Sequence, residues 1–231
     1  MITTTKQKNV EQHGEVLDSQ EFGINEERTA HLMQLLRDMY SRPWEAAPRE
    51  YVANAVDAHV EVGKHTVPVE VTLPYQHYSL GEQLQFKVRD YGPGLSKEDT
   101  VRLLFSYGSS GDFKMNSNDA IGGFGVGSKC GYAIADQFMY TIYHEGICRI
   151  WNCYLDENDA GKASLLSETK SDEPSGVEVS IPIEASQVYK MDEKMANMFA
   201  HLPVPVQVTH TDKTWVVQDA VIEPTSKGSI P

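Results

Sequence analysis

The stretch that decides the fold reads Arg49-Glu50-Tyr51-Val52-Ala53-Asn54-Ala55-Val56-Asp57-Ala58-His59. Pro48, a residue type favoured at the first helical position, stands directly before it, and Gly63 follows soon after it. The sequence therefore predicts one helix between Pro48 and Gly63. The sides of this helix that can pack against a core carry Val52, Ala55, Val56 and His59.

Three polar residues of this helix, Glu50, Asn54 and Asp57, are spaced i, i+4 and i+7, so they share one stripe. The spacing leaves two interpretations open. The stripe is either the solvated face of an amphipathic helix or a site where a carboxylate acts as a base beside an amide that binds Mg²⁺ through oxygen. Taken alone, the spacing favours the solvated face.

The second motif is the turn Asp90-Tyr91-Gly92-Pro93-Gly94, which directly follows a strand predicted over residues 84–89. An aspartate at a strand end can accept a hydrogen bond from an exocyclic amine. The two glycines let the backbone approach a flat ligand closely. By itself, however, the pentapeptide is typical of an ordinary Pro-Gly turn, and the motif alone favours that interpretation.

The third motif is Gly122-Gly123-Phe124-Gly125-Val126-Gly127-Ser128-Lys129, which opens a helix predicted to run through Ala135. Glycines at this density present successive backbone N–H groups at a helix start, an arrangement that cradles phosphate. The spacing fits neither the Walker A nor the Rossmann pattern. A flexible hinge is the alternative, but it does not account for Ser128 and Lys129 directly after the glycines.

The rest of the chain is organised around these motifs. Residues 1–24 are predicted to be a polar arm, residues 25–185 hold the three motifs, and residues 186–231 are predicted as an extension or the start of a following domain. The further predicted elements are helices over 25–41 and 188–201, strands over 67–73, 138–144, 147–155 and 176–183, a β-like stretch over 204–217, and a surface loop over 156–175. This uneven mix predicts an α+β two-layer sandwich rather than a Rossmann sheet.

Composition limits the function classes. Of the 231 residues, 40% are apolar and 23% are charged, as in soluble globular proteins. The net charge of −13 argues against a basic nucleic-acid surface. No apolar run approaches the roughly 20 residues that span a bilayer. Three scattered cysteines form neither a disulfide framework nor a metal knuckle, so a reducing, cytoplasmic compartment is expected: Cys130, Cys148 and Cys153.

The order and spacing of the motifs resemble a known family. The pattern is Arg49-Glu50-x-x-x-Asn54-x-x-Asp57-Ala58, then Asp90-x-Gly92-x-Gly94, then Gly122-x-x-Gly125-x-Gly127. It resembles the GHKL ATPases, the superfamily of gyrase B subunits, Hsp90 chaperones, MutL and sensor histidine kinases, over about residues 25–185. The resemblance implies the Bergerat sandwich, in which helices cover one face of a mixed sheet and nucleotide lies between the two layers.

The resemblance also implies roles for the helix residues, with ATP and Mg²⁺ as cofactors. Glu50 looks like the general base that activates water, and Arg49 looks like the neighbour that restrains it. Asn54 would bind Mg²⁺, and Asp57 would support that shell.

The turn and the glycine-rich motif would then hold the nucleotide. Asp90 would accept a hydrogen bond from the adenine amino group, with Gly92 and Gly94 close to the ring. Residues 122–129 would cover the triphosphate, and residues 106–121 would form a mobile lid. Many members carry Gly-Thr on a late strand, where the Thr assists at the adenine through water. The matching place here is Ser175-Gly176-Val177, so either Ser175 substitutes or one polar contact is missing.

Within the superfamily, the wording of the motifs looks most similar to the phage rIIA-type rapid-lysis proteins. That similarity implies a protein of lysis inhibition in the cytoplasm of an infected bacterium, with a partner of the rIIB type. Members of that group are longer, so the chain is expected to be their N-terminal ATPase segment.

Three functions follow from these features. The first is an Mg²⁺-dependent ATPase whose nucleotide state drives homodimerisation or partner binding. The second is a nucleotide-binding module with little turnover, since relatives complete their site with a lysine from a following domain and no counterpart is evident here. A histidine kinase is least favoured, because His31 lacks a recognisable phospho-acceptor context.

Overall fold

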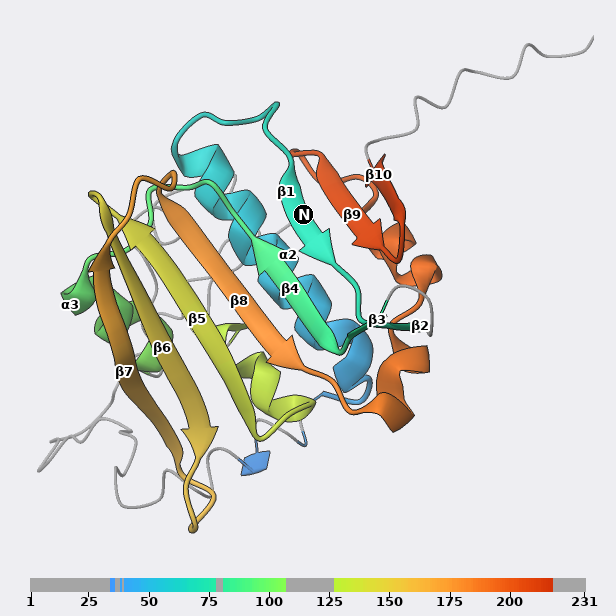
Figure 1. The fold of residues 1–231 in the computed structure, drawn as a ribbon, viewed down its shortest axis with the longest axis horizontal. Coiled ribbons are helices and arrows are strands. Elements are labelled where there is room, and N and C mark those ends of the chain that lie inside the picture. The colour runs from blue at the N-terminus through green and yellow to red at the C-terminus, as the bar shows by residue number, and fades with distance from the viewer. Residues whose placement is uncertain (1–33, 36–37, 39, 78–80, 107–126, 218–231) are drawn as a thin grey trace, which may run out of the picture.

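The computed structural model describes residues 34–35, 38, 40–77, 81–106 and 127–217 of the chain. Its centre is an eight-stranded sheet in the order β10-β9-β1-β4-β8-β5-β6-β7, with helices behind one face (Figure 1). The sheet is mixed, because β1 and β9 run parallel whereas the other neighbours are antiparallel. The predicted α+β two-layer sandwich is therefore confirmed.

The strands of the large sheet are β1 (Val69–Thr72), β4 (Gln85–Arg89), β5 (Gln137–His144), β6 (Ile147–Leu155), β7 (Gly161–Lys170), β8 (Gly176–Pro182), β9 (Val206–His210) and β10 (Lys213–Val217). A separate hairpin of β2 (Tyr75–His77) and β3 (Gly81–Gln83) lies beside it. In β1, and in β4 as far as Val88, side chains alternate between buried and partly exposed, because successive residues of a strand point to opposite faces. Their buried face packs against the helix layer.

The main helix of that layer is α2 (Pro43–Glu61). Its buried side includes Val52, Ala55, Val56 and His59, as the sequence predicts. The predicted start at Pro48 is wrong, because the helix begins at Pro43, which also suits a first-turn position. Pro48 lies inside the helix and has no amide hydrogen for the ladder. The fully buried Ala47 holds this additional N-terminal turn against the core.

Strand β7 corrects the predicted surface loop over residues 156–175. Residues 161–170 pair with β6 along its length, and the register shifts between Ile150 and Trp151, opposite Leu166. Among the described strands, β7 pairs with β6 alone, so it forms one edge of the sheet. An edge strand with a mostly exposed side needs no strict apolar alternation, and its serines and charged residues therefore resemble those of a loop.

The shorter helices differ from the prediction mainly in type. Ser96 caps α3 (Lys97–Asp99), accepting a hydrogen bond of 3.0 Å from the Asp99 amide, and a π-helical turn, η2 (Thr100–Phe105), follows. The helix predicted from Ser128 through Ala135 is a 3₁₀ helix, η3 (Gly127–Ala133). The helix predicted over 188–201 is two 3₁₀ helices, η4 (Ala185–Lys190) and η5 (Glu193–Phe199).

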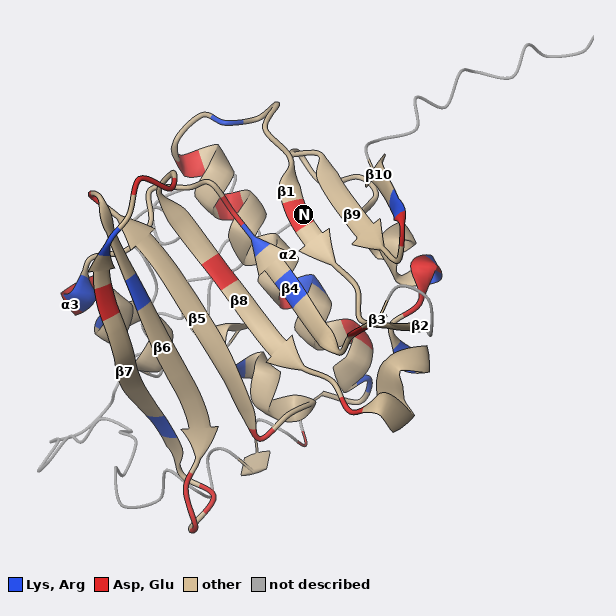
Figure 2. Cartoon of the chain, in the orientation of Figure 1, with Lys and Arg blue, Asp and Glu red and all other residues tan. Residues whose placement is uncertain are grey.

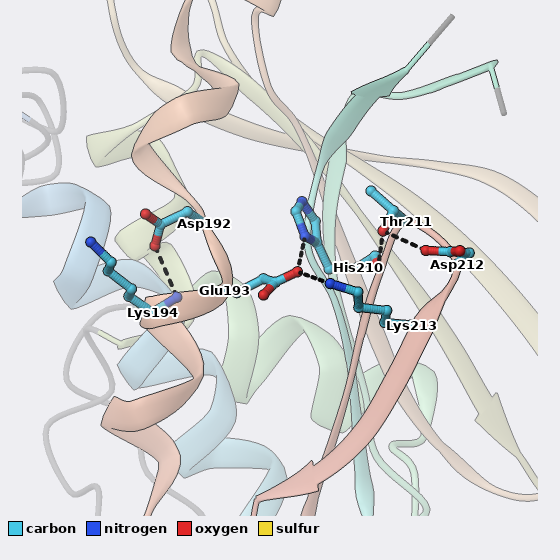
Figure 3. Close-up of polar contacts among 7 residues, drawn as sticks. All are labelled: Asp192, Glu193, Lys194, His210, Thr211, Asp212 and Lys213. Carbon is cyan, nitrogen blue, oxygen red and sulfur yellow. Dashed lines mark hydrogen bonds and ion pairs between the residues drawn. The ribbon is translucent and has the colours of Figure 1, made fainter. Parts of the chain in front are cut away.

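The predicted β-like stretch over 204–217 is the hairpin β9–β10, which joins the large sheet beside β1. Side chains fasten η5 to this hairpin (Figure 3). Glu193 Oε1 lies 3.5 Å from His210 Nδ1 and 3.4 Å from Lys213 Nζ, so one carboxylate contacts both strands. The pairing of β9 with β1 thus holds the described C-terminal segment to the rest of the sheet, and Glu193 ties η5 to the hairpin.

The face of the sheet that points away from α2 is polar. Figure 2 shows basic residues on β4 between acidic residues on β1 and β8. The register places Arg89 of β4 opposite Glu70 of β1 and Glu178 of β8. We call this side the open face of the sheet.

Candidate nucleotide-binding site

The polar stripe of α2 faces the interior of the site rather than bulk solvent. Asp57 is only 1% exposed, and Glu50 and Asn54 are half-buried. A solvated outer face would leave all three side chains in water, so the burial of Asp57 excludes that interpretation. Arg49 is exposed, and no hydrogen bond or ion pair joins it to Glu50 within the described part of the chain. Its restraining role stays a prediction.

Gly127 brings the end of the glycine-rich motif directly against this stripe. A Cβ atom at Gly127 would lie 2.6 Å from Glu50 Oε2 and 3.4 Å from Asn54 Nδ2. The first and third motifs, more than seventy residues apart in sequence, therefore meet in space. Residues 122–126 and 107–121, which include most of the predicted phosphate cradle and lid, lie outside the described residues.

With Glu50 as the base that the resemblance implies, Gly127→Ala is expected to lower ATP turnover roughly 10- to 100-fold, because the new methyl group displaces the Glu50 carboxylate and misplacing a reacting group by about 1 Å is that costly. The change adds no backbone strain, since Gly127 does not adopt a left-handed conformation. Phosphate release measured in a double-mutant cycle checks this expectation. In a Glu50→Ala background the substitution should cost nothing further, and additive losses would contradict it.

Asp90 lies at the end of β4 and is 6% exposed. Its Oδ1 accepts hydrogen bonds from the amides of Gly92 (2.8 Å) and Val177 (3.2 Å), while its own amide donates to Val177 O (2.9 Å). All the hydrogen bonds that the described residues make to this carboxylate use Oδ1, which leaves Oδ2 as an acceptor for a ligand. Burial raises the pKa of Asp90 to about 6, so the group is ionised at neutral pH.

At the place where many family members carry a Thr that assists at the adenine, backbone groups of this chain contact Asp90, and among the described residues there no side chain hydrogen-bonds to it. Val177 contacts Asp90 through its amide and its carbonyl, and it follows Gly176 at the start of β8. Ser175 is half-buried directly before them, and no hydrogen bond of its hydroxyl to Asp90 occurs in the described part of the structure. Ser175 as a substitute for the missing polar contact stays a prediction.

The glycines of the second motif let it pack closely. A Cβ at Gly92 would lie 2.6 Å from the Cβ of Ala58, so the turn sits directly against α2. Gly94 has a φ of +69°, and a side chain there would collide with the carbonyl of Tyr143 in β5. The carbonyl of Pro93 lies 3.1 Å from Nδ1 of His144. The turn is therefore fixed between α2 and the end of β5.

Sequence reasoning missed the two side chains that hold Tyr91 in this turn. His59, fully buried, accepts the Tyr91 amide at Nε2 (2.7 Å), while its Nδ1 lies 3.0 Å from Val67 O and so carries the proton. Burial lowers the pKa of His59, which keeps this neutral form. Lys64 Nζ donates to Tyr91 O over 2.6 Å. The feature of the sequence that could have indicated this contact is His59, a histidine on the packing side of α2.

Two further tyrosines, also missed, support the start of η3. The hydroxyls of Tyr51 (3.2 Å) and Tyr140 (2.7 Å) both donate to Ser128 O, and the Tyr51 hydroxyl accepts the Gly131 amide (3.0 Å). Both rings are buried in the core. The backbone of Ser128 and Gly131 is thus anchored on α2 and β5.

Lys129 is buried, and its ammonium donates to Ser106 O (2.6 Å) and to Ser128 Oγ (3.0 Å). Ser128 Oγ in turn donates to Leu104 O (3.2 Å). These bonds hold Ser106 beside η3. Burial lowers the pKa of Lys129 to about 8, which leaves it mainly protonated at neutral pH.

Together, the layered fold and the meeting of the first and third motifs are typical of an α+β sandwich of the GHKL class. A family model described as "Histidine kinase-, DNA gyrase B-, and HSP90-like ATPase" matches residues 40–180. The chain therefore belongs to this ATPase family. No curated protein matches the sequence. Across the described residues, no helix is long and apolar enough to cross a membrane.

Proposed function

We propose that the protein binds ATP with Mg²⁺ and hydrolyses it slowly, using the binding state as a conformational switch. The observation that carries the proposal is Asp90, a buried carboxylate whose Oδ1 is held by two backbone amides and whose Oδ2 is left to accept from a ligand. An adenine amino group is a donor of the required kind. Family membership supports the same ligand.

The helix stripe supplies groups suited to the phosphate end. Glu50 beside Gly127 would act as the base that takes a proton from the attacking water. Mg²⁺ prefers oxygen ligands and keeps several waters, so the Asn54 amide oxygen and the phosphate oxygens are enough to hold it. The bound ion would neutralise charge on the phosphates. Asp57, buried one turn further along, would support Asn54.

Asn54→Ala is expected to abolish the Mg²⁺ dependence of ATP affinity, because one amide oxygen is a large part of the protein's share of the shell. Calorimetric titration with ATP, in Mg²⁺ and in EDTA, measures that dependence. Asn152→Ala, on β6, is the matched control and should keep the parent's ratio of affinities. Equal stimulation by Mg²⁺ in the parent and in Asn54→Ala would contradict the role.

The second candidate is a binding module that holds ATP with little turnover. This candidate rests on the sequence, which shows no evident counterpart of the lysine that completes the site in relatives. Steady-state phosphate release at saturating ATP separates the two. Turnover that falls in Glu50→Ala supports the ATPase, whereas tight binding without turnover supports the module.

The physiological setting is a further part of this proposal. The residues of the three motifs support a role like that of the phage rIIA-type proteins in the bacterial cytoplasm. ATP binding would then drive homodimerisation or binding of an rIIB-type partner. Light scattering with and without a non-hydrolysable ATP analogue tests homodimerisation. A molecular mass unchanged by the analogue would contradict a nucleotide-driven homodimer.

A further inference from the structure

Arg89 is a charged side chain enclosed on the open face of the sheet, directly before Asp90. It is 8% exposed, and its guanidinium carbon lies 4.8 Å from the ring centroid of Tyr91 and 4.4 Å from that of Tyr143. The cation thus sits between two aromatic faces, an arrangement that stabilises a desolvated guanidinium. The Tyr91 hydroxyl also donates to Glu70 (2.9 Å), which fixes that ring.

The guanidinium joins two backbone segments. Nη1 donates to the carbonyl of Asp90, and Nη2 donates to the carbonyl of Pro174 over 2.6 Å. Asp90 directly follows β4 and Pro174 precedes β8, so the guanidinium bridges the end of β4 and the start of β8, where Asp90 and Val177 are hydrogen-bonded. The guanidinium presents its donors from two nitrogens in a fixed plane toward the two carbonyls, whereas an ammonium group offers rotatable donors from a single nitrogen.

Gly176 leaves the room that this bridge requires. Its φ is +145°, and a Cβ there would collide with Arg89 Nη1 and with Asp90 O. The register also places Gly176 opposite Tyr143. The arginine can therefore cross β8 to reach the Tyr143 ring only because position 176 has no side chain.

We propose that Arg89 is a positioning residue for the nucleotide base: acting from the open face, it holds the ends of β4 and β8 so that Asp90 presents Oδ2 to the adenine amine. This inference rests on the proposed ATP site. It adds a residue that never touches the ligand and lies on the opposite side of the sheet from α2.

The charges that act on Asp90 come from both sides. Arg89 on the open face and Lys64 after α2 both lower the pKa of the carboxyl, against the larger effect of burial, which raises it to about 6. His59, neutral, lies at the adjacent Tyr91 amide. Removing the Arg89 charge should therefore move the Asp90 titration to higher pH.

The first test compares Arg89→Met with Lys87→Met, which removes a cation from the same strand and the same face but not from the bridge. ATP affinity at pH 7.5 should fall at least about tenfold in Arg89→Met, as expected for a lost positioning contact, and stay within about twofold in Lys87→Met. An affinity of Arg89→Met within that same twofold range would overturn the inference.

The second test adds the variant Arg89→Lys, which covers a failure of Arg89→Met to fold, and a pH readout that needs no nucleotide. The Val177 amide resonance reports protonation of Asp90, because that amide donates to Oδ1. Its pH midpoint, near 6 in the parent, should rise in Arg89→Met and stay near the parent's in Arg89→Lys, which keeps the charge. Arg89→Lys should still bind ATP more weakly than the parent, because it lacks the guanidinium.

These readouts separate the two ideas. A parent protein that binds no ATP refutes the proposed function, whereas the Val177 midpoint still shows whether Arg89 controls Asp90. A parent that binds ATP, with an affinity unchanged in Arg89→Met or in Arg89→Lys, refutes only the inference.

Discussion

Glu50→Ala is expected to bind ATP about as tightly as the parent and to lose roughly 10²–10⁴-fold of its turnover, the usual contribution of a positioned general base. In the proposed mechanism the carboxylate would act on the attacking water rather than on the bound nucleotide, so ground-state affinity should be spared. Alanine is a strong helix former and suits this position of α2. Phosphate release and calorimetric affinity, measured on the same preparations, give both quantities.

Glu45→Ala is the matched control for this substitution. Glu45 lies in the first turn of the same helix and pairs with Arg42 at the surface, 3.5 Å away. Its removal should leave turnover unchanged. If Glu50→Ala retains the parent's turnover, Glu50 is not the base, and the binding-module function should replace the ATPase.

Asp90→Asn is expected to weaken ATP binding by about 1.5–3 kcal/mol, the cost of a lost charge-assisted hydrogen bond. The asparagine keeps Oδ1 for the amides of Gly92 and Val177 and therefore turns its NH₂ group toward the adenine amine, donor against donor. The parent should also prefer ATP to GTP, which carries a carbonyl at that place. Comparable affinities for ATP and GTP would exclude Asp90 as the adenine acceptor.

The same variant should fold at least as stably as the parent at pH 7.5. The pKa of Asp90 is raised from 3.8 to about 6 in the folded state, so its favourable contribution is full below pH 4 and is lost as pH rises through about 6. Above pH 6 the buried carboxylate costs as much as about 3 kcal/mol, at 1.36 kcal/mol per pKa unit, and asparagine avoids this cost. Urea unfolding at pH 4 and pH 7.5 measures the difference, which should grow with pH. A variant less stable than the parent at pH 7.5 would contradict this account of the site.

The parts of the fold that were predictable depend on local periodicity. The stripe of α2 and the alternation in β1, β4 and β5 depend on which side chains are buried. The spacing of apolar residues in the sequence predicts that burial. Strand β7 was not predictable in this way, because its partner β6 and not its own side chains holds it in the sheet.

The candidate site also has a part that local sequence predicts and a part that it does not. Glu50, Asn54 and Asp90 stand in short motifs whose order is visible in the sequence, whereas their supports are joined by long-range contacts. The Tyr51 and Tyr140 hydroxyls meet on Ser128 O, and nothing local marks either of them. Sequence spacing therefore indicates candidate ligand-binding groups better than it indicates the side chains that hold the surrounding backbone in place.

The parallel pairing of β1 with β9 has a consequence for synthesis on the ribosome. The Val69 amide donates to Pro205 O and the Leu73 amide to Thr209 O, each over 2.9 Å. During translation β1 emerges long before β9, so one row of its backbone groups has no strand partner until the C-terminal hairpin leaves the exit tunnel. Such distant pairing slows folding and exposes an edge to other nascent chains. The interval between the synthesis of these two strands is therefore the one in which this edge of β1 is open to pairing with other chains.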